Sequence, residues 1–172
     1  MNNADIGQLH NTNHGWKQTQ SLLEQGKTDL GHIDWRQRRI IRQRQKTKGK
    51  GRIPTVCYKL WNETFDLLKK YRSEHERYCL LTKRGTSLWL RDGKRKDSIY
   101  DRSWKNLKSL TPKQLRAGGA TILGHHHTFK LYIPQYLADS PRGIPDRHYV
   151  VPSQLQFDAA IIWLGKQLKV TV

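Results

Sequence analysis

The sequence is short of acidic side chains. Only 14 of its 172 residues are Asp or Glu, against 32 Lys and Arg, which gives a formal net charge of +18 and a pI of about 10.2. Such an excess of one sign repels itself in a compact fold and therefore indicates a polyanionic partner. Nucleic acid is the favoured partner, and an anionic membrane surface is the weaker alternative.

Long apolar runs and cysteines are scarce as well. No stretch is apolar for long enough to span a bilayer, and the N-terminus lacks the apolar segment of a signal peptide. The only two cysteines, Cys57 and Cys79, belong to no CxxC or Cys/His ligand pattern. These absences argue against a membrane partner and a disulfide framework, and they predict a cytoplasmic protein with two ordinary thiols.

Large side chains are present in sufficient number for one core. Hydrophobic residues make up 35% of the chain, a low share for a soluble domain, but six Trp and seven Tyr add bulk. The length suits one domain, so we expect residues 1–172 to form a single domain without internal repeats.

Three short β-type segments stand close together in the first half of the chain. They are Ile33–Trp35, Arg39–Arg42 and Ile53–Tyr58. The segment 45–51 between the last two contains two glycines and is typical of a hairpin loop. We therefore predict a small antiparallel sheet at about residues 33–58.

Signals for helix starts follow the sheet. Asn62 is the expected N-cap of a first helix, whose buried face carries three apolar residues: Phe65, Leu68 and Tyr71. Thr111 before Pro112 predicts a second start, because threonine caps a helix and proline fits its first turn. Ser153 opens a final amphipathic helix, and Cys79–Thr82 is typical of another short strand. The expected fold is a mainly helical α+β domain.

Basic residues are concentrated in the predicted hairpin. Nine Lys and Arg and no acidic residue lie between residues 36 and 52. A charged sheet edge that prevents aggregation is one explanation. Contact with phosphates is the favoured explanation, and the sparse aromatic residues favour duplex DNA over single strands. The expected contacts include Arg42, Arg44, Lys48 and Lys50.

Four segments carry a resemblance to a known family. Leu115–Thr121, Tyr136–Pro141 and Asp146–Tyr149 follow one another in the order and at the spacing of the tyrosine recombinase (phage integrase) signature. Arg44–Lys48 is similar to the β-hairpin of that family. The resemblance covers nearly the whole chain as a catalytic domain, and it implies a tyrosine-recombinase-like fold.

The resemblance implies a phosphoryl-transfer mechanism that needs neither metal nor other cofactor. Tyr149 would attack a phosphodiester and form a 3′-phosphotyrosine, and Arg116 would hold the non-bridging oxygens. Lys46 would protonate the departing 5′-oxygen. Arg147 and His148, which precede the nucleophile, would contact DNA. The His125–His127 triplet allows a metal site as an alternative, but adjacent histidines point in different directions and disfavour it.

Three positions depart from the family pattern. Asn2 stands where the family has its first arginine, and it offers neither the charge nor the bidentate fork. Lys113 replaces the histidine of the His-x-x-Arg motif, and Asp139 takes the place of a His or Trp. A carboxylate at that place repels phosphate unless it is paired or turned away. We still list Lys113 and Asp139 with the catalytic positions.

Two functions from different classes follow from these observations. The first is a DNA-binding recombinase or integrase domain that acts in DNA integration and recombination and assembles on paired DNA sites. The second is a non-catalytic duplex-DNA-binding remnant of a mobile-element integrase. The N-terminal helical domain with which the family binds the other face of its DNA site is expected to be absent from this chain. Either the true start of the protein lies upstream, or the chain is a decaying remnant of a mobile element.

Overall fold

The computed structural model describes residues 31–43, 54–75, 78–86, 88, 110–139 and 153–170. These residues form a mixed fold with a small antiparallel sheet and four α-helices, in agreement with the α+β prediction. The elements in chain order are β1 (His32–Asp34), β2 (Arg39–Gln43), β3 (Thr55–Lys59), α3 (Asn62–Lys70), α5 (Pro112–Gly124), the 3-10 helix η2 (Phe129–Tyr132), α6 (Ile133–Tyr136) and α8 (Gln154–Gln167).

The three strands form one sheet in the order β1-β2-β3. Ile33 lies opposite Ile40, and Ile40 lies opposite Tyr58 on the next strand. Successive residues of a strand point to opposite faces, and residues directly opposite each other on neighbouring strands share a face. This register therefore gathers the apolar side chains of neighbouring strands on a common face. The prediction of a small antiparallel sheet at about 33–58 is confirmed.

The N-cap of helix α3 lies one residue earlier in the chain than predicted. The N-cap is Trp61, which gives no side-chain cap hydrogen bond, and Asn62 is the first helical residue. The Asn62 side chain instead accepts a hydrogen bond from Arg38 Nη1 at 3.0 Å. Phe65 is buried as predicted, but Tyr71 is 61% exposed because the helix ends before it. The predicted N-cap at Asn62 and the burial of Tyr71 were wrong.

The segment Cys79–Thr82 is not a regular strand. Leu81 makes only an isolated bridge, and Thr82 begins a tight turn in which its amide donates to Thr86 O at 2.9 Å. Cys79 is buried against the sheet and α3, and its carbonyl accepts from the Ser73 amide at 2.7 Å. The segment therefore packs as an extended loop.

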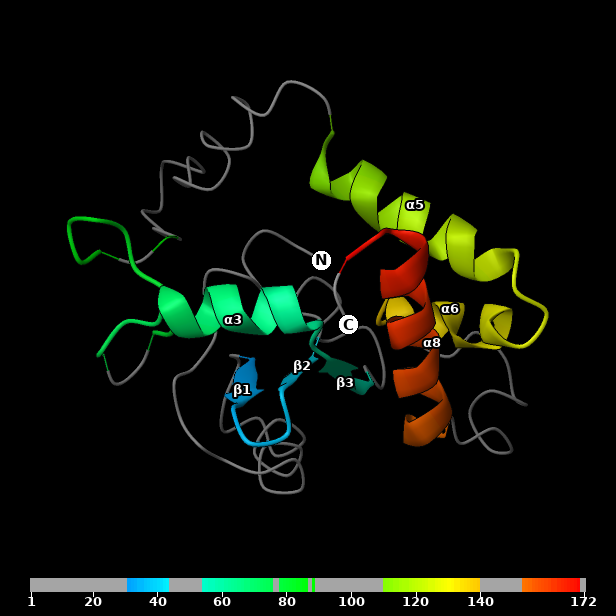
Figure 1. Ribbon diagram of the computed structural model, residues 1–172, viewed down its shortest axis with the longest axis horizontal. Coiled ribbons are helices and arrows are strands. Elements are labelled where there is room, and N and C mark those ends of the chain that lie inside the picture. The colour runs from blue at the N-terminus through cyan, green and yellow to red at the C-terminus, as the bar shows by residue number, and fades with distance from the viewer. Residues whose placement is uncertain are drawn as a thin grey trace.

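The described residues contain two large hydrophobic clusters and a small one formed by Ile41 and Cys57. The first lies between the sheet and α3, and its buried members are Ile33, Ile40, Leu60, Phe65 and Cys79. The second lies among β3, α5, η2, α6 and α8, and its buried members are Val56, Leu123, Tyr132, Ala138, Phe157, Ala160, Ile161 and Leu164. Figure 1 shows α3 beside the sheet on one side and the other helices gathered beyond β3.

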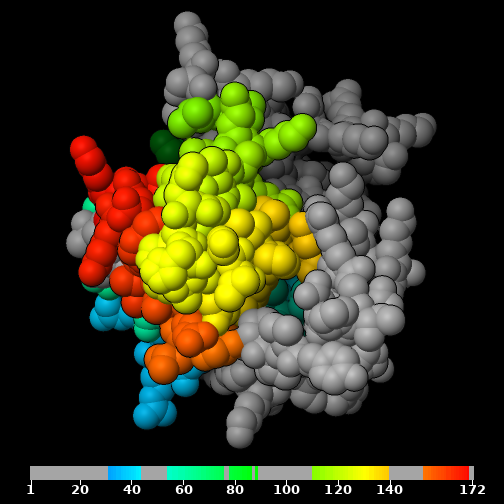
Figure 2. All heavy atoms as spheres, turned by 90° about the vertical axis from the view of Figure 1, so that its right-hand side faces the viewer, coloured from blue at the N-terminus to red at the C-terminus, as the bar shows by residue number. Residues whose placement is uncertain are grey.

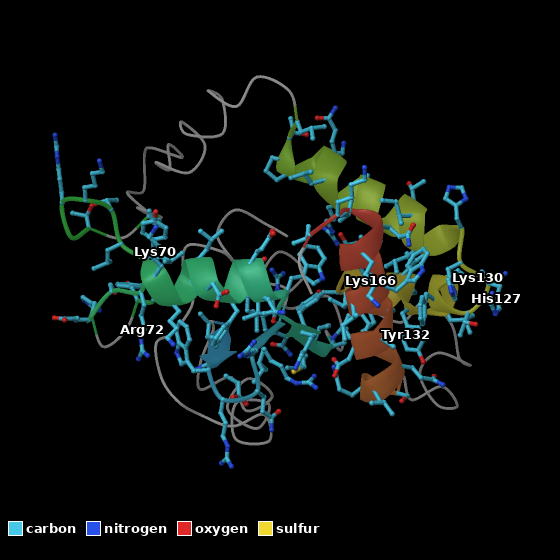
Figure 3. The ribbon with its side chains drawn as sticks, viewed as in Figure 1. Lys70, Arg72, His127, Lys130, Tyr132 and Lys166 are labelled. Carbon is cyan, nitrogen blue, oxygen red and sulfur yellow. The ribbon has the colours of Figure 1, made fainter. Side chains whose placement is uncertain are left out.

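The helices beyond β3 form one packed unit. In Figure 2, α5, the η2–α6 segment and α8 lie against one another without a gap between their atoms. The hydroxyl of Tyr132 on η2 donates to Gln156 Oε1 on α8, and Figure 3 places Tyr132 beside that helix. Trp61, which precedes α3, donates its indole N–H to Ile161 O on α8 at 2.8 Å. This bond connects the two clusters.

An ion pair fixes α8 to the sheet. Arg39 on β2 donates from Nη1 to Asp158 Oδ1 at 2.8 Å, and its Nη2 bonds the other carboxylate oxygen. Gln154 Nε2 donates to Asp158 Oδ1 at 2.8 Å and to Cys57 O on β3 at 2.9 Å. Burial by itself lowers the pKa of Arg39, but the hydrogen bond to Asp158, the interactions with Cys57 and the attraction to the Asp158 charge together outweigh burial and raise the pKa. Arg39, one of the nine hairpin cations, is therefore part of the fold.

None of the helices in the described ranges combines the length and the apolar character needed to cross a membrane.

Candidate phosphate-binding site

The start of α5 is fixed by a capping box. Gln114 N donates to Thr111 Oγ1 at 3.2 Å, and Thr111 N donates to Gln114 Oε1 at 2.8 Å. Pro112 occupies the first turn, as the Thr111-Pro112 pair predicted. The rigid start places Arg116 in the second turn of the helix, with its side chain part-buried.

The end of α6 is a Schellman turn that faces Arg116. Asp139 N donates to Pro134 O at 2.9 Å and Ala138 N donates to Gln135 O at 3.0 Å. Ala138 takes the left-handed conformation with φ 48°, a conformation that favours glycine. The buried Ala138 methyl holds the turn in the core, so Leu137 and Asp139 are presented at a fixed place beside α5.

The Schellman turn is also anchored to the sheet. Tyr58 on β3 donates its hydroxyl to Tyr136 O at 3.1 Å, with Gln135 O at 3.4 Å as a second acceptor. The Tyr58 ring in turn packs edge-on against Phe157 of α8 at 5.8 Å between centroids. The turn is thereby held from β3, independently of its contact with α5.

Arg116 meets the turn through one nitrogen. Its Nη2 donates to Leu137 O, 21 residues away in sequence, and lies 3.7 Å from Asp139 Oδ1. The two charged side chains remain 25% and 21% exposed. Within the described residues, Nε and Nη1 of Arg116 make no hydrogen bond. A guanidinium in this state is oriented but keeps donors for an anion such as phosphate.

Tyr136 completes the surroundings of Arg116. An ideal Cβ built on Gly119 would lie 2.2 Å from Tyr136 Oη and 2.8 Å from its Cζ, so the phenol lies directly on the helix backbone. Gly119 follows Arg116 by three residues, which places both on one face of α5. Burial raises the pKa of Tyr136, and the charge of Arg116 opposes that rise. The phenol is therefore neutral at physiological pH.

The structure brings together two of the predicted catalytic positions, Arg116 and Asp139. Lys113 is exposed on α5, one helical turn before Arg116, and forms no hydrogen bond or ion pair with Arg116 or Asp139. Two other predicted catalytic residues, Lys46 and Tyr149, lie outside the described residues. So do Asn2 and the predicted DNA contacts Arg44, Lys48, Lys50, Arg147 and His148.

Arg42 is the one predicted DNA contact that the structure describes. It lies on β2 opposite Val56 and is only 3% exposed. A side chain buried to this degree offers little surface to a phosphate, so we leave Arg42 out of the interface proposed below.

The histidine triplet packs as aromatic rings. His126 stacks on Phe129 at 4.0 Å and meets Trp163 of α8 edge-on at 4.8 Å. Its Nδ1 accepts from the amides of Thr128 and Phe129 at 3.3 and 3.2 Å. In the part of the chain that the structure describes, no three His, Cys, Asp or Glu side chains could hold a metal ion.

Sequence reasoning missed Tyr136, Gly119 and the Leu137 carbonyl as parts of the site. The adjacent glycines 118 and 119, one turn after Arg116 in a helix, were a usable signal, because glycine inside a helix costs about 1 kcal/mol and needs a reason. Nothing local identified Tyr136 as that reason.

Family models, curated protein sequences and solved structures were compared with this chain, and none of them matches it.

Proposed function

We propose that this chain is a catalytic domain of the tyrosine recombinase type, which binds duplex DNA and was built for strand exchange in DNA integration and recombination. The observation that carries the proposal is the meeting of Arg116 with position 139. The sequence resemblance assigns these two positions to one phosphate, and in the fold their side chains lie 3.7 Å apart.

The chemistry of the proposed reaction is a transesterification. The phenol of Tyr149 gives up its proton to water, and the resulting phenolate oxygen forms a bond to phosphorus while the bond from phosphorus to the 5′-oxygen breaks. Lys46 supplies the proton that the departing 5′-oxygen takes up. Arg116 stabilises the charge on the non-bridging oxygens with the donors that the Schellman turn leaves unused. The energy of the broken ester is kept in the phosphotyrosine, so the reaction needs no nucleotide cofactor.

The second candidate is a non-catalytic duplex-DNA-binding remnant of an integrase. The favouring observation is the carboxylate of Asp139, which faces the same guanidinium that would hold the phosphate. A fixed negative charge there disfavours a doubly charged transition state more than it disfavours bound DNA. Asn2 and Lys113 weaken catalysis in the same direction.

A nicked duplex of mixed sequence distinguishes the two functions. A recombinase domain traps a covalent protein–DNA adduct that survives denaturation, and Tyr149→Phe abolishes it. The role of Lys46 is tested with substrates in which sulfur replaces the 5′-bridging oxygen, since a thiolate leaves without a proton. Lys46→Ala should fail on the oxygen substrate and recover on the sulfur substrate. DNA binding with no adduct on either substrate would establish the remnant.

A further inference from the structure

The hydroxyl of Tyr136 occupies a place that packing does not require. The ring of Tyr136 packs against the second hydrophobic cluster, a task that a phenylalanine or leucine performs equally well. The hydroxyl, in contrast, reaches the helix backbone at Gly119, where any side chain would collide with it. The chain therefore has a glycine in the middle of α5 at the place where the phenol lies, although glycine is a poor helix former.

The hydroxyl also has no partner of its own among the described residues. No hydrogen bond joins Tyr136 Oη to any of them, although Tyr58 and Tyr132 both donate theirs. Tyr136 Oη is not one of the buried side-chain atoms that lack a partner, so the hydroxyl is open to solvent and accessible to a ligand. A donor that is fixed in place and that the described residues do not use suits a ligand.

The position of the hydroxyl selects the ligand. It lies over the residue three positions after Arg116, on the same face of α5, and it feels the charge of that guanidinium. Leu137, the next residue, supplies the carbonyl that orients Arg116. An anion bound by the remaining donors of Arg116 comes within reach of a neutral phenol donor on the same side of the helix.

We propose that Tyr136 is a second phosphate ligand, donating a hydrogen bond from Oη to an oxygen of the phosphate group that Arg116 binds. This proposal rests on the proposed function, because it assumes that Arg116 holds a phosphate. It gives a role to Tyr136, a residue of the matched segment to which the resemblance assigns none. The site then contains the guanidinium of Arg116 from α5 and the neutral hydroxyl of Tyr136 from α6. The absence of a side chain at Gly119 lets the hydroxyl lie against α5 on the same side as Arg116.

The test is a titration of the full chain with inorganic phosphate at constant ionic strength, followed through the Arg116 Nε–H resonance. In the wild-type protein this resonance should shift with saturation. Tyr136→Phe keeps the ring and removes only the hydroxyl, so it should weaken phosphate binding at Arg116 about tenfold. The melting temperature of the variant, measured in parallel, should stay close to that of the wild type.

Tyr132→Phe is the matched control, since it removes a hydroxyl that bonds Gln156 on α8 and not the Arg116 site. It should leave phosphate binding at Arg116 unchanged. Equal phosphate binding by Tyr136→Phe and wild type would overturn the proposal while leaving Arg116 as a phosphate site. An Arg116 resonance that phosphate does not move in the wild type would overturn the phosphate site itself. A covalent DNA adduct lost in Tyr136→Phe but kept in Tyr149→Phe would make Tyr136 a nucleophile and contradict its role as a donor.

Discussion

Two arginine–aspartate pairs among the described residues differ in geometry, exposure and partners. Arg39 and Asp158 share two hydrogen bonds, have 16% and 12% of their side chains exposed, and recruit Gln154 as a third partner. Arg116 and Asp139 approach only to 3.7 Å through one nitrogen and are 25% and 21% exposed. The first pair joins β2 to α8, whereas the second joins a helix to the turn beside it.

The difference separates a charged side chain that stabilises the fold, Arg39, from one that remains able to bind an anion, Arg116. A bidentate pair on the sheet satisfies its own donors and acceptors, so removing one partner leaves an uncompensated charge. The looser pair leaves donors of Arg116 unused, and these donors can bind another anion. In a chain with a net charge of +18, the number of cations does not identify the DNA-binding residues, but the geometry of each pair does.

The largest effect should come from breaking the structural pair. Arg39→Ala leaves Asp158 buried without its partner, and we expect the free energy of unfolding to fall by about 3 kcal/mol. Urea denaturation of the variant beside Arg116→Ala measures the contrast. Equal losses in the two variants would remove the distinction between the pairs.

The thiol beside the structural pair should make stability depend on alkaline pH. Burial raises the pKa of Cys57 to about 11, while nearby Arg39 lowers it. In the unfolded chain a thiol ionises near pH 9, so between pH 9 and 11 the folded state holds more protons than the unfolded state. Stability should therefore be complete below pH 9 and fall by about 2 kcal/mol as the pH rises to 11.

Urea denaturation at several pH values, with wild type and Cys57→Ala compared, measures this contribution. The variant should lose less stability than the wild type over the same range. Parallel curves would mean that the Cys57 thiol ionises as readily in the folded state as in the unfolded one.

The contact between Gly119 and Tyr136 should reverse the usual effect of a glycine substitution. Gly118→Ala meets nothing within 4 Å and should stabilise α5 by about 1 kcal/mol. Gly119→Ala collides with the Tyr136 hydroxyl, and a clash cost of about 2 kcal/mol should leave it about 1 kcal/mol less stable than the wild type. In a Tyr136→Ala background the same substitution should become stabilising. Thermal denaturation of these variants follows the sign, and matching signs at positions 118 and 119 would refute the contact.

Asp139→Asn should have the smallest effect on stability and a visible effect on binding. The loose pair contributes less than about 1 kcal/mol, so unfolding should hardly change. Removing the competing carboxylate should strengthen phosphate binding at Arg116 about fivefold. The Arg116 resonance used with inorganic phosphate measures this affinity. A weaker affinity would mean that Asp139 orients Arg116 for the anion and does not compete with it.

Local signals predicted the elements, and long-range contacts escaped them. The sheet followed from alternating side chains and a glycine loop, and the start of α5 followed from Thr111 and Pro112, because these signals act within a few residues. Arg39 and Asp158 are 119 residues apart, and no local rule links them. For the same reason, the sequence did not predict the contact between Tyr136 and Gly119. Arg42 was predicted at the interface because its charge was visible in sequence, whereas its burial was not.

The salt dependence of duplex binding shows directly whether Arg116 is available to bind a DNA phosphate. Affinity for a duplex of fixed sequence is measured from low to high salt for wild type, Arg116→Gln and Lys130→Gln. Lys130→Gln removes one exposed charge on η2, near His127 (Figure 3), and serves as the matched control. We expect the slope of the logarithm of the association constant against the logarithm of the salt concentration to become shallower by about 0.9 in Arg116→Gln and to stay the same in Lys130→Gln. An unchanged slope in Arg116→Gln, or an equal change in both variants, would contradict it.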